Sequence, residues 1–462
     1  MEDRIINEQD LENWRRTHYS SQVNGSDIDQ IIIIMGWISS KRDHGNVLFI
    51  QLRDKFGDIQ IVVKKGKENE GNRVFDILKN LKEHSSVGIK GKVVEQKKSP
   101  NGVEVIPHEI KVLSVSEKSA PFLTNSISTV GIDTRLELRA LDLRRNYLQN
   151  IFKIRFTILN SVREFLTTNH FIEVNTPKMI STATEGGAAL FPIFYYDKEA
   201  FLAQSPQLYK EQLTMAFENV FEIAPIFRAE PSRTNRHLSE AISIDVEKAF
   251  VNYCDIMDLL DGLISYIILR IREVNSNELK NLDIELSEIK IPFPRHTYSE
   301  LIDKLQKSHK YIRWGDDISP KILKDVIGDD FYYIVDWPLS TKPFYVKAKI
   351  NSDDALSKFS PSVDSSESDN VMVSESFDLM YGPLELSSGS TRINNKNVLL
   401  DSMKKKGLNS SAFDYHLRVF DYGIPPHAGF GLGLERLIMA LLKVDNIRDT
   451  TFYPRDIDRL TP

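Results

Sequence analysis

Side chains that could bind a polyphosphate gather in residues 225–250. Arg228 and Glu230 directly follow an apolar run, and a stretch rich in Ser, Thr and Asn then ends at Arg236 and His237. Guanidinium groups present paired donors that match phosphate oxygens, and the imidazole adds a third potential cation. The composition of this stretch therefore predicts an anion site. The alternative is a solvated hairpin with ordinary surface charge.

A second stretch, GFGLGLER at residues 429–436, is rich in glycine. It lacks the Lys-Ser or Lys-Thr of a phosphate loop, and its glycines do not have the Rossmann spacing. We therefore expect a glycine-rich strand that enters a helix near Leu434, with Arg436 in the first helical turn. The small residues would let the backbone approach a nucleotide base closely.

Several motifs together resemble one enzyme family. FRAE, RHL and SIDVE in residues 227–247 are similar to the second signature motif of class II aminoacyl-tRNA synthetases. TEGGAALF and AQSPQLYKE in residues 184–211, with GFGLGLER and the terminal FYPRDIDRLTP, resemble the aspartyl-tRNA synthetases of archaeal and eukaryotic type. The resemblance extends from residue 16 to residue 462, and the motifs occur in the family's order.

The resemblance implies an ATP site and a set of catalytic residues. Arg228 would hold the α-phosphate and the amino-acid carboxylate, Glu230 the adenine amino edge, and Arg436 the γ-phosphate end, and these three are the expected catalytic residues. The residues implied to contact ATP are Arg228, Ala229, Glu230, Arg236, His237, Leu238, Glu385, Gly433, Leu434, Glu435 and Arg436. Many relatives place a phenylalanine after RHxxE to stack on adenine, whereas this chain has Ala241. What covers adenine is left open.

The same resemblance implies an aspartate site. The residues implied to contact aspartate are Glu185, Gln207, Leu208, Tyr209, Lys210, Arg228, Asp245, Ser388 and Arg392. In the family pattern Glu185, Gln207 and Asp245 receive the ammonium group. Lys210 and Arg392 match the positions that face the side-chain carboxylate. Without the resemblance, Lys210 would be read as part of a solvated helix face, because QLYKEQL is good helix sequence.

Oxygen-bearing side chains near residue 380 could hold a metal ion. Asp378 and Glu385 stand seven residues apart, and Ser388 follows them. Carboxylate and hydroxyl oxygens suit Mg²⁺, which would bridge the phosphates of ATP. We therefore expect Mg²⁺ as a cofactor. The alternative is a pair of surface carboxylates.

The elements that must position these residues follow a smaller domain. Five short apolar runs lie at residues 31–40, 47–53, 58–63, 87–94 and 103–113, with a helical pattern at 72–81. This order predicts an OB-type barrel, a fold that binds single-stranded nucleic acid. Arg42, Phe49 and Gln60 match family positions that bind anticodon bases. The alternatives are core packing for Phe49 and a solvated strand face for Gln60.

Three regions are therefore expected. Residues 1–115 would form the OB-fold anticodon-binding domain with a short N-terminal extension, 116–137 a hinge, and 138–462 a class II catalytic domain. The fold class is α+β, with an antiparallel sheet flanked by helices in the larger domain. Helical spacing at 147–166, followed by a strand at 171–178, resembles the motif through which the family forms homodimers. The Ser- and Asp-rich segment 351–375 carries no functional signal.

Composition limits the class of protein. The 462 residues are 41% hydrophobic and 27% charged, with a net charge of −6, which is typical of a water-soluble globular protein. One cysteine excludes an intramolecular disulfide. The sequence lacks an apolar run of about 18 residues, as a membrane span needs, and its start lacks a signal-peptide core. A cytoplasmic location is expected.

These features predict ATP-dependent aspartylation of tRNA through an aspartyl-adenylate. The partners would be tRNA(Asp), ATP and L-aspartate, and charging of tRNA(Asn) is left open. The nearest alternative is an asparagine–tRNA ligase, which shares the barrel and the motifs. PFY at 343–345, SPQLYK at 205–210 and RDIDRLTP at the end favour the aspartyl enzyme. An amide synthetase that acts without RNA would lack the barrel, and a non-catalytic RNA-binding paralogue would not keep Arg228, Glu385 and Arg436.

Overall fold

The computed structural model describes residues 7–66, 69–99, 101–124, 130–181, 190–308, 312–316, 318, 323, 330–349 and 372–462. The chain divides into two compact units, Met1–Arg145 and Asn146–Pro462. The boundaries expected at residues 115 and 137 stay predictions. Most of the Ser- and Asp-rich segment, residues 351–371, lies outside the described residues.

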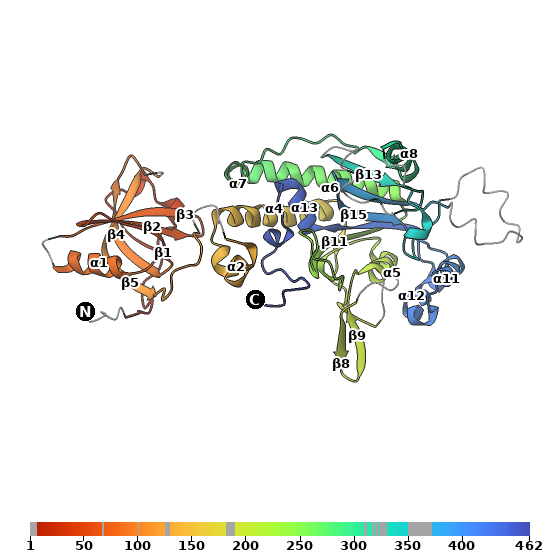
Figure 1. Cartoon of the computed structure of the whole chain (residues 1–462), viewed down its shortest axis with the longest axis horizontal. Helices are drawn as coiled ribbons and strands as arrows, with labels where there is room; N and C mark the ends of the chain where they lie inside the picture. The colour runs from red at the N-terminus through yellow and green to blue at the C-terminus, as the bar shows by residue number, and fades with distance from the viewer. Residues whose placement is uncertain are drawn as a thin grey trace, which may run out of the picture. The chain divides into compact units, whose positions relative to one another are not determined.

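The first unit is a closed five-stranded barrel (Figure 1). Its strands are β1 (Ile31–Asp43), β2 (Val47–Asp54), β3 (Gly57–Lys64), β4 (Ser86–Glu95) and β5 (Val103–Ser114), in the closed order β1-β2-β3-β5-β4. Helix α1 (Asn69–Asn80) lies between β3 and β4 in the chain, and the short helices α2 (Ile132–Glu137) and α3 (Arg139–Asp142) follow the barrel. The predicted OB-type barrel is confirmed.

Alternation along the strands builds the barrel core. Leu48 and Ile50 on β2, with Ile59 and Ile61 on β3, are buried in one apolar cluster. Because neighbouring side chains of a strand point to opposite faces, the residues between these positions face outward. The outward set includes Phe49 and Gln60.

The second unit is built on an eight-stranded mixed sheet, whose order is β12-β13-β14-β15-β16-β11-β10-β6. The central strands are β10 (Asn219–Phe227), β11 (Glu240–Ala249), β13 (Phe331–Val335), β14 (Ser376–Tyr381), β15 (Leu384–Thr391) and β16 (His427–Gly433), and they pair antiparallel. The outer strands β6 (Ile172–Glu173) and β12 (Arg295–Thr297) pair parallel to their neighbours. The predicted hairpin of β10 and β11 is confirmed. The strand expected at 171–178 is only two residues long.

Helices cover both faces of this sheet. The long helices α4 (Asn146–Thr168) and α6 (Tyr253–Val274) pack together, and α6 contacts β15 and β16. Figure 1 shows α6 above the sheet and α5 (Gln207–Phe217) below it, where α5 packs on β10 and β11. Helix α13 (Leu434–Leu442) continues directly from β16, as the glycine-rich motif predicts. The part of this unit that the structure describes also contains α7 (Ser276–Asn281), α8 (Tyr298–Ser308), α11 (Lys396–Lys405) and α12 (Asp414–Leu417).

A small three-stranded sheet projects from the second unit (Figure 1). It consists of β7 (Met179–Ile180), β8 (Pro192–Tyr195) and β9 (Lys198–Leu202), and β8 and β9 form its hairpin. Across the described ranges, the helices are too short or too polar to span a membrane.

Candidate active site

A cavity of about 630 Å³ opens in the second unit. Its walls come from the β10–β11 hairpin, β15, β16 and the starts of α5 and α13. Most of the residues that the sequence singles out line it, namely Gln207, Lys210, Arg228, Glu230, Arg236, His237, Leu238, Asp245, Glu385, Ser388, Arg392, Gly433, Glu435 and Arg436. The structure thus brings together residues from four separate segments of the chain, 207–210, 228–245, 385–392 and 433–436.

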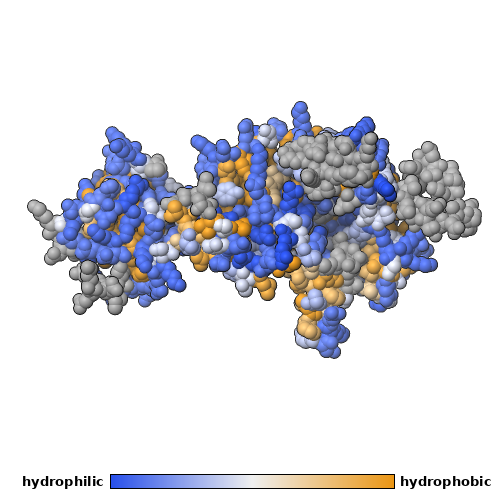
Figure 2. Space-filling model, in the orientation of Figure 1, coloured by the Kyte–Doolittle hydropathy of each residue, from blue (hydrophilic) through white to orange (hydrophobic). Residues whose placement is uncertain are grey.

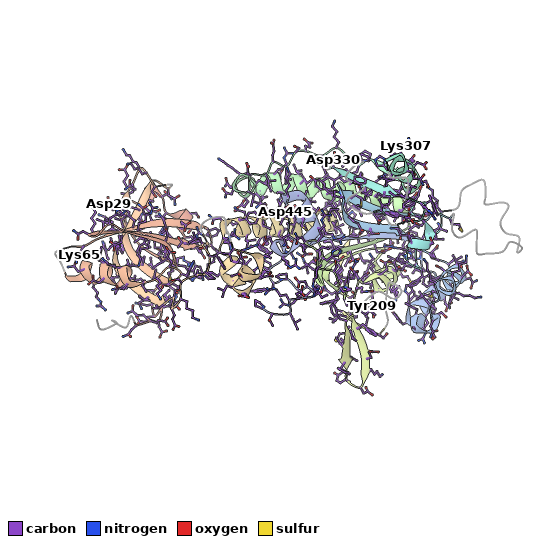
Figure 3. All side chains as sticks on the ribbon, in the orientation of Figure 1. Asp29, Lys65, Tyr209, Lys307, Asp330 and Asp445 are labelled. Carbon is purple, nitrogen blue, oxygen red and sulfur yellow. The ribbon has the colours of Figure 1, made fainter. Side chains whose placement is uncertain are left out.

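A few expected residues lie behind the cavity wall or outside the described residues. Leu208 is fully buried in an apolar cluster with Phe344 and Leu399, so its side chain packs the core. Tyr209, labelled in Figure 3, packs its ring 6.1 Å from that of Tyr415. The side chains of Ala229, Leu434 and Asp378 are also not part of the lining. Glu185 lies outside the described residues.

Cations gather at one end of the cavity. Arg228 follows β10, its backbone N–H donates to the Ser239 carbonyl at 2.9 Å, and its side chain remains 49% exposed. Arg436 projects from the first turn of α13 and donates to the Glu385 carbonyl at 3.1 Å. Burial lowers the pKa of His237, and the neighbouring charges of Arg436 and Arg228 lower it further. Arg228 lies 4.0 Å from Glu230 and Arg436 lies 3.9 Å from Glu385, and the remaining N–H donors of the two arginines could bind an anion.

Two carboxylates stand beside these cations. Asp378 on β14 lies opposite Ser388 on β15, and a register irregularity places Glu385 opposite Met380. Desolvation within the cavity and the negative charge of Asp378 raise the pKa of Glu385, although 49% of its side chain is accessible to solvent. Lys342 Nζ lies 3.0 and 3.1 Å from the two oxygens of Asp378. Within the described ranges, His, Cys, Asp and Glu side chains do not gather in threes to form a metal site.

The opposite end of the cavity holds a buried network of charges. Lys210 Nζ donates to Asp245 Oδ1 at 2.9 Å and lies 3.5 Å from Glu247 Oε2. Arg392 forms a two-point pair with Glu247, with N–O distances of 2.9 and 3.1 Å. A single carboxylate therefore holds both cations in place, and Lys210 and Arg392 are not free ammonium and guanidinium groups awaiting a ligand.

Glu247 is a site residue that the sequence argument missed. Its side chain is fully buried and does not line the cavity. A signal was present, since Asp245 and Glu247 are two positions apart on one strand and so face the same side of the sheet. That spacing indicates a second carboxylate near Lys210 but does not reveal its partners.

The structure shows what surrounds Ala241, the position at which the sequence leaves open how adenine is covered. Ala241 lines the cavity and is the cross-strand partner of Ile226, which also lines it. Phe250, the next aromatic residue along the chain, lies beyond the end of β11 and is exposed, so it does not replace the missing ring. The wall at this position is aliphatic.

The expected anticodon residues share the outer surface of the barrel. Arg42 on β1 is the cross-strand partner of Phe49 on β2, and the Phe49 ring meets the His44 ring edge-on at 5.6 Å. Phe49 is half-buried and stands outside the core cluster. Gln60 Nε2 donates to Glu104 Oε2 at 2.9 Å. The face of this unit seen in Figure 2 is mainly hydrophilic.

Comparison with known proteins covers almost the whole chain. Residues 131–457 match the family model described as tRNA synthetases class II (D, K and N), and residues 32–113 match the OB-fold nucleic acid binding domain. The Aspartate--tRNA(Asp/Asn) ligase of Methanococcus aeolicus is 44% identical over 98% of this chain and 99% of its own. That of Methanocaldococcus jannaschii is 43% identical over 97% and 99%.

A solved structure has the same arrangement of elements. The crystal structure of asparaginyl-tRNA synthetase from Pyrococcus horikoshii complexed with asparaginyl-adenylate matches with a TM-score of 0.87 and 31% identity. The match covers 97% of this chain and 100% of that one.

Proposed function

The chain belongs to the class II tRNA synthetases of the D, K and N group, and we propose that it joins aspartate to tRNA with ATP. One observation carries the choice of amino acid. Lys210 and Arg392 both line the cavity, where Asp245 and Glu247 hold them in position, so a substrate carboxylate placed there would share two cations with these carboxylates. The names of the similar archaeal ligases agree with aspartate.

The geometry supports activation by positioning and charge neutralisation. The α-carboxylate of aspartate would attack the α-phosphorus of ATP, forming a carboxyl–phosphate bond while the bond to pyrophosphate breaks. Both reactants are anions, so cations must hold them together. Arg228 would neutralise the charge at the reacting phosphate and Arg436 the charge at the far phosphate end, where His237 would donate a hydrogen bond. A ribose hydroxyl of tRNA would then take the aspartyl group, releasing AMP.

The residues present fit Mg²⁺. Glu385 and Ser388 line the cavity and offer hard oxygen atoms, and Asp378 would join them by exchanging its pair with Lys342 for the ion. The raised pKa of Glu385 beside Asp378 indicates negative charge that a cation would offset. These residues would hold the ion together with phosphate oxygens. Bound there, it would supply charge neutralisation for the departing pyrophosphate.

An asparagine–tRNA ligase is the second candidate, because the Pyrococcus horikoshii asparaginyl enzyme shares the fold. Amino-acid-dependent exchange of pyrophosphate into ATP, measured with aspartate and with asparagine, separates the two. We expect aspartate to be favoured by at least a hundredfold in kcat/KM. Preference for asparagine would contradict the proposal.

Aminoacylation of purified tRNA(Asp) and tRNA(Asn) with aspartate tests the RNA partner. Because the similar ligases carry the name Asp/Asn, we propose that both are charged. Charging of tRNA(Asp) alone would restrict the function to that tRNA. The cytoplasmic location stays a prediction.

We also propose a homodimer. Phe156 on α4 is 67% exposed and Ile172 on β6 is 46% exposed, so the elements expected at the dimer interface present apolar side chains. Sedimentation of the wild type and of Phe156→Glu tests this. A monomer at micromolar wild-type concentration would contradict it.

A further inference from the structure

A buried glutamate lies behind the amino-acid end of the cavity. Glu211 follows Lys210 on α5, and its side chain is fully buried. Its Oε1 accepts a hydrogen bond from Gln207 Nε2 at 2.7 Å, one helical turn away. A buried carboxylate is costly unless other groups compensate its charge, so its surroundings need an explanation.

Two buried histidines compensate that charge. Glu211 Oε2 lies 3.4 Å from Nε2 of His416 and 3.7 Å from Nε2 of His427. The other contacts of the two histidine rings indicate which nitrogen atoms carry hydrogen. His427 Nδ1 lies 2.7 Å from the Pro425 carbonyl, which can only accept, so Nδ1 carries hydrogen. A neutral His427 would then turn a lone pair toward the carboxylate, whereas a protonated ring turns N–H.

The charges agree with this assignment. Burial alone would raise the pKa of Glu211, but His416 and His427 hold it well below its usual range. Burial alone would lower the pKa of His427, but Glu211, with Glu247 further away, raises it. On the other side of His416, Gln212 Nε2 lies 3.3 Å from Nδ1. The amide can donate there, which would place the hydrogen of His416 on Nε2, the nitrogen nearer Glu211. Neither histidine meets hydrogen-bond geometry with Glu211 Oε2, so the two rings act on the carboxylate through their charge.

An ionised carboxylate fixes its partner's orientation. It has no proton to give, so the Gln207 amide must turn its NH₂ group toward Glu211. The carboxamide is planar, and its oxygen is then the atom available to the cavity that Gln207 lines. A carbonyl oxygen accepts from an ammonium group, whereas an NH₂ group would oppose it.

We propose that Glu211 is a positioning residue that holds the Gln207 carboxamide with its oxygen toward the cavity, as acceptor for the α-ammonium of the amino acid. This deepens the proposed function and rests on it. His416 and His427 serve this role indirectly, because they keep Glu211 ionised in the protein interior.

Removing the acceptor tests the assignment. Glu211→Met keeps the side-chain volume but removes the acceptor of the Gln207 amide, so the carboxamide is free to rotate. We expect the KM for aspartate to rise at least tenfold in pyrophosphate exchange, with the KM for ATP within twofold of wild type. Glu211→Gln still offers one oxygen to Gln207, so we expect less than a threefold rise. Succinate, which is aspartate without its amino group, should inhibit Glu211→Met as well as it inhibits the wild type.

Asp261→Leu is the matched control. Asp261 is a buried carboxylate on α6 that accepts from Tyr333 Oη at 2.7 Å and does not line the cavity. Its loss should lower the melting temperature without raising the KM for aspartate.

Three results would overturn the assignment. They are an unchanged KM for aspartate in Glu211→Met, an equal rise for ATP and aspartate, or equal effects of the Met and Gln substitutions. Preference of the wild type for asparagine would refute the proposed function instead. The KM of Glu211→Met would then be measured with asparagine. Asparagine carries the same α-ammonium group, so its KM must rise as expected for aspartate.

Discussion

Arg228 and Arg436 reach the cavity from a strand end and a helix start, so substitution of either should spare the fold. Arg228→Ala and Arg436→Ala each remove a charged donor expected at a phosphate. We expect a loss of about 2–4 kcal/mol of transition-state stabilisation, seen as a fall of about 30- to 900-fold in pyrophosphate exchange. Arg233→Ala is the control, because Arg233 is exposed on the same loop and pairs with Asp458 at 3.0 Å. Exchange within tenfold of wild type in either test variant would refute the phosphate role.

Arg392 tests amino-acid specificity. Arg392→Leu should raise the KM for aspartate sharply, because the aspartate carboxylate loses one of two cationic partners. The preference for aspartate over asparagine in kcat/KM should also become smaller, because the asparagine amide then faces one cation instead of two. The substitution also leaves Glu247 with Lys210 alone, and breaking a buried pair costs about 3–5 kcal/mol. The double variant Arg392→Leu/Glu247→Leu should recover stability in thermal unfolding without recovering specificity. An unchanged preference for aspartate in Arg392→Leu would remove Arg392 from the specificity residues.

Glu385 tests the metal. Glu385→Gln keeps the size but removes an anionic oxygen ligand. We expect a higher Mg²⁺ concentration for half-maximal exchange and a large fall in turnover. Asp401→Asn, which changes an exposed carboxylate on α11, should leave the titration unchanged. Superimposable Mg²⁺ titrations of wild type and Glu385→Gln would show that Glu385 is not a ligand.

At the scale of elements, glycines on β16 make room for the buried charges. Gly429 is the cross-strand partner of Glu247, and a Cβ there would overlap the Glu247 carboxylate and the Val246 carbonyl. The strand can therefore pack against β11 only because this position lacks a side chain. The sequence predicts that these glycines let the backbone approach a nucleotide base. Gly429 also lets the backbone of β16 lie close to the buried Glu247 carboxylate.

Gly429→Ala should disturb both stability and the substrate site. Overpacking costs about 1–3 kcal/mol, and displacement of Glu247 should loosen Lys210 and Arg392. We expect a lower melting temperature together with a higher KM for aspartate. Gly25→Ala, where an added Cβ meets no atom within 4 Å, should change neither. A Gly429→Ala variant with wild-type melting and KM would show that the strand adapts without cost.

Regular patterns made the elements predictable, but local sequence does not identify long-range partners. Alternation located the hairpin that carries Arg228, and helical spacing located α4 and α6. The strand at 171–178 was overestimated because only Ile172 and Glu173 pair with β10. The partners of Glu247 and Glu211 could not be predicted, since Arg392 and His416 reach them from positions 145 and 205 residues further along the chain.

At the scale of the whole molecule, the barrel and the cavity belong to different compact units. The residues that line the cavity all come from the second unit, while Arg42, Phe49 and Gln60 all belong to the first. Amino-acid activation and RNA recognition should therefore respond to different substitutions. Loss of RNA binding should leave pyrophosphate exchange intact, because that reaction needs only ATP and the amino acid.

Phe49→Ala makes this separation measurable. The ring is half-buried on the outer surface of the barrel, so its removal should cost little stability. Stacking on a base is worth about 1–3 kcal/mol, so kcat/KM for tRNA charging should fall roughly 5- to 150-fold while exchange is unchanged. Phe56→Ala is the control, since Phe56 is an exposed ring on the same barrel that packs edge-on against Tyr19 at 4.9 Å. Equal loss of charging and exchange, accompanied by a lower melting temperature, would assign Phe49 to the structure of the barrel instead of to the RNA.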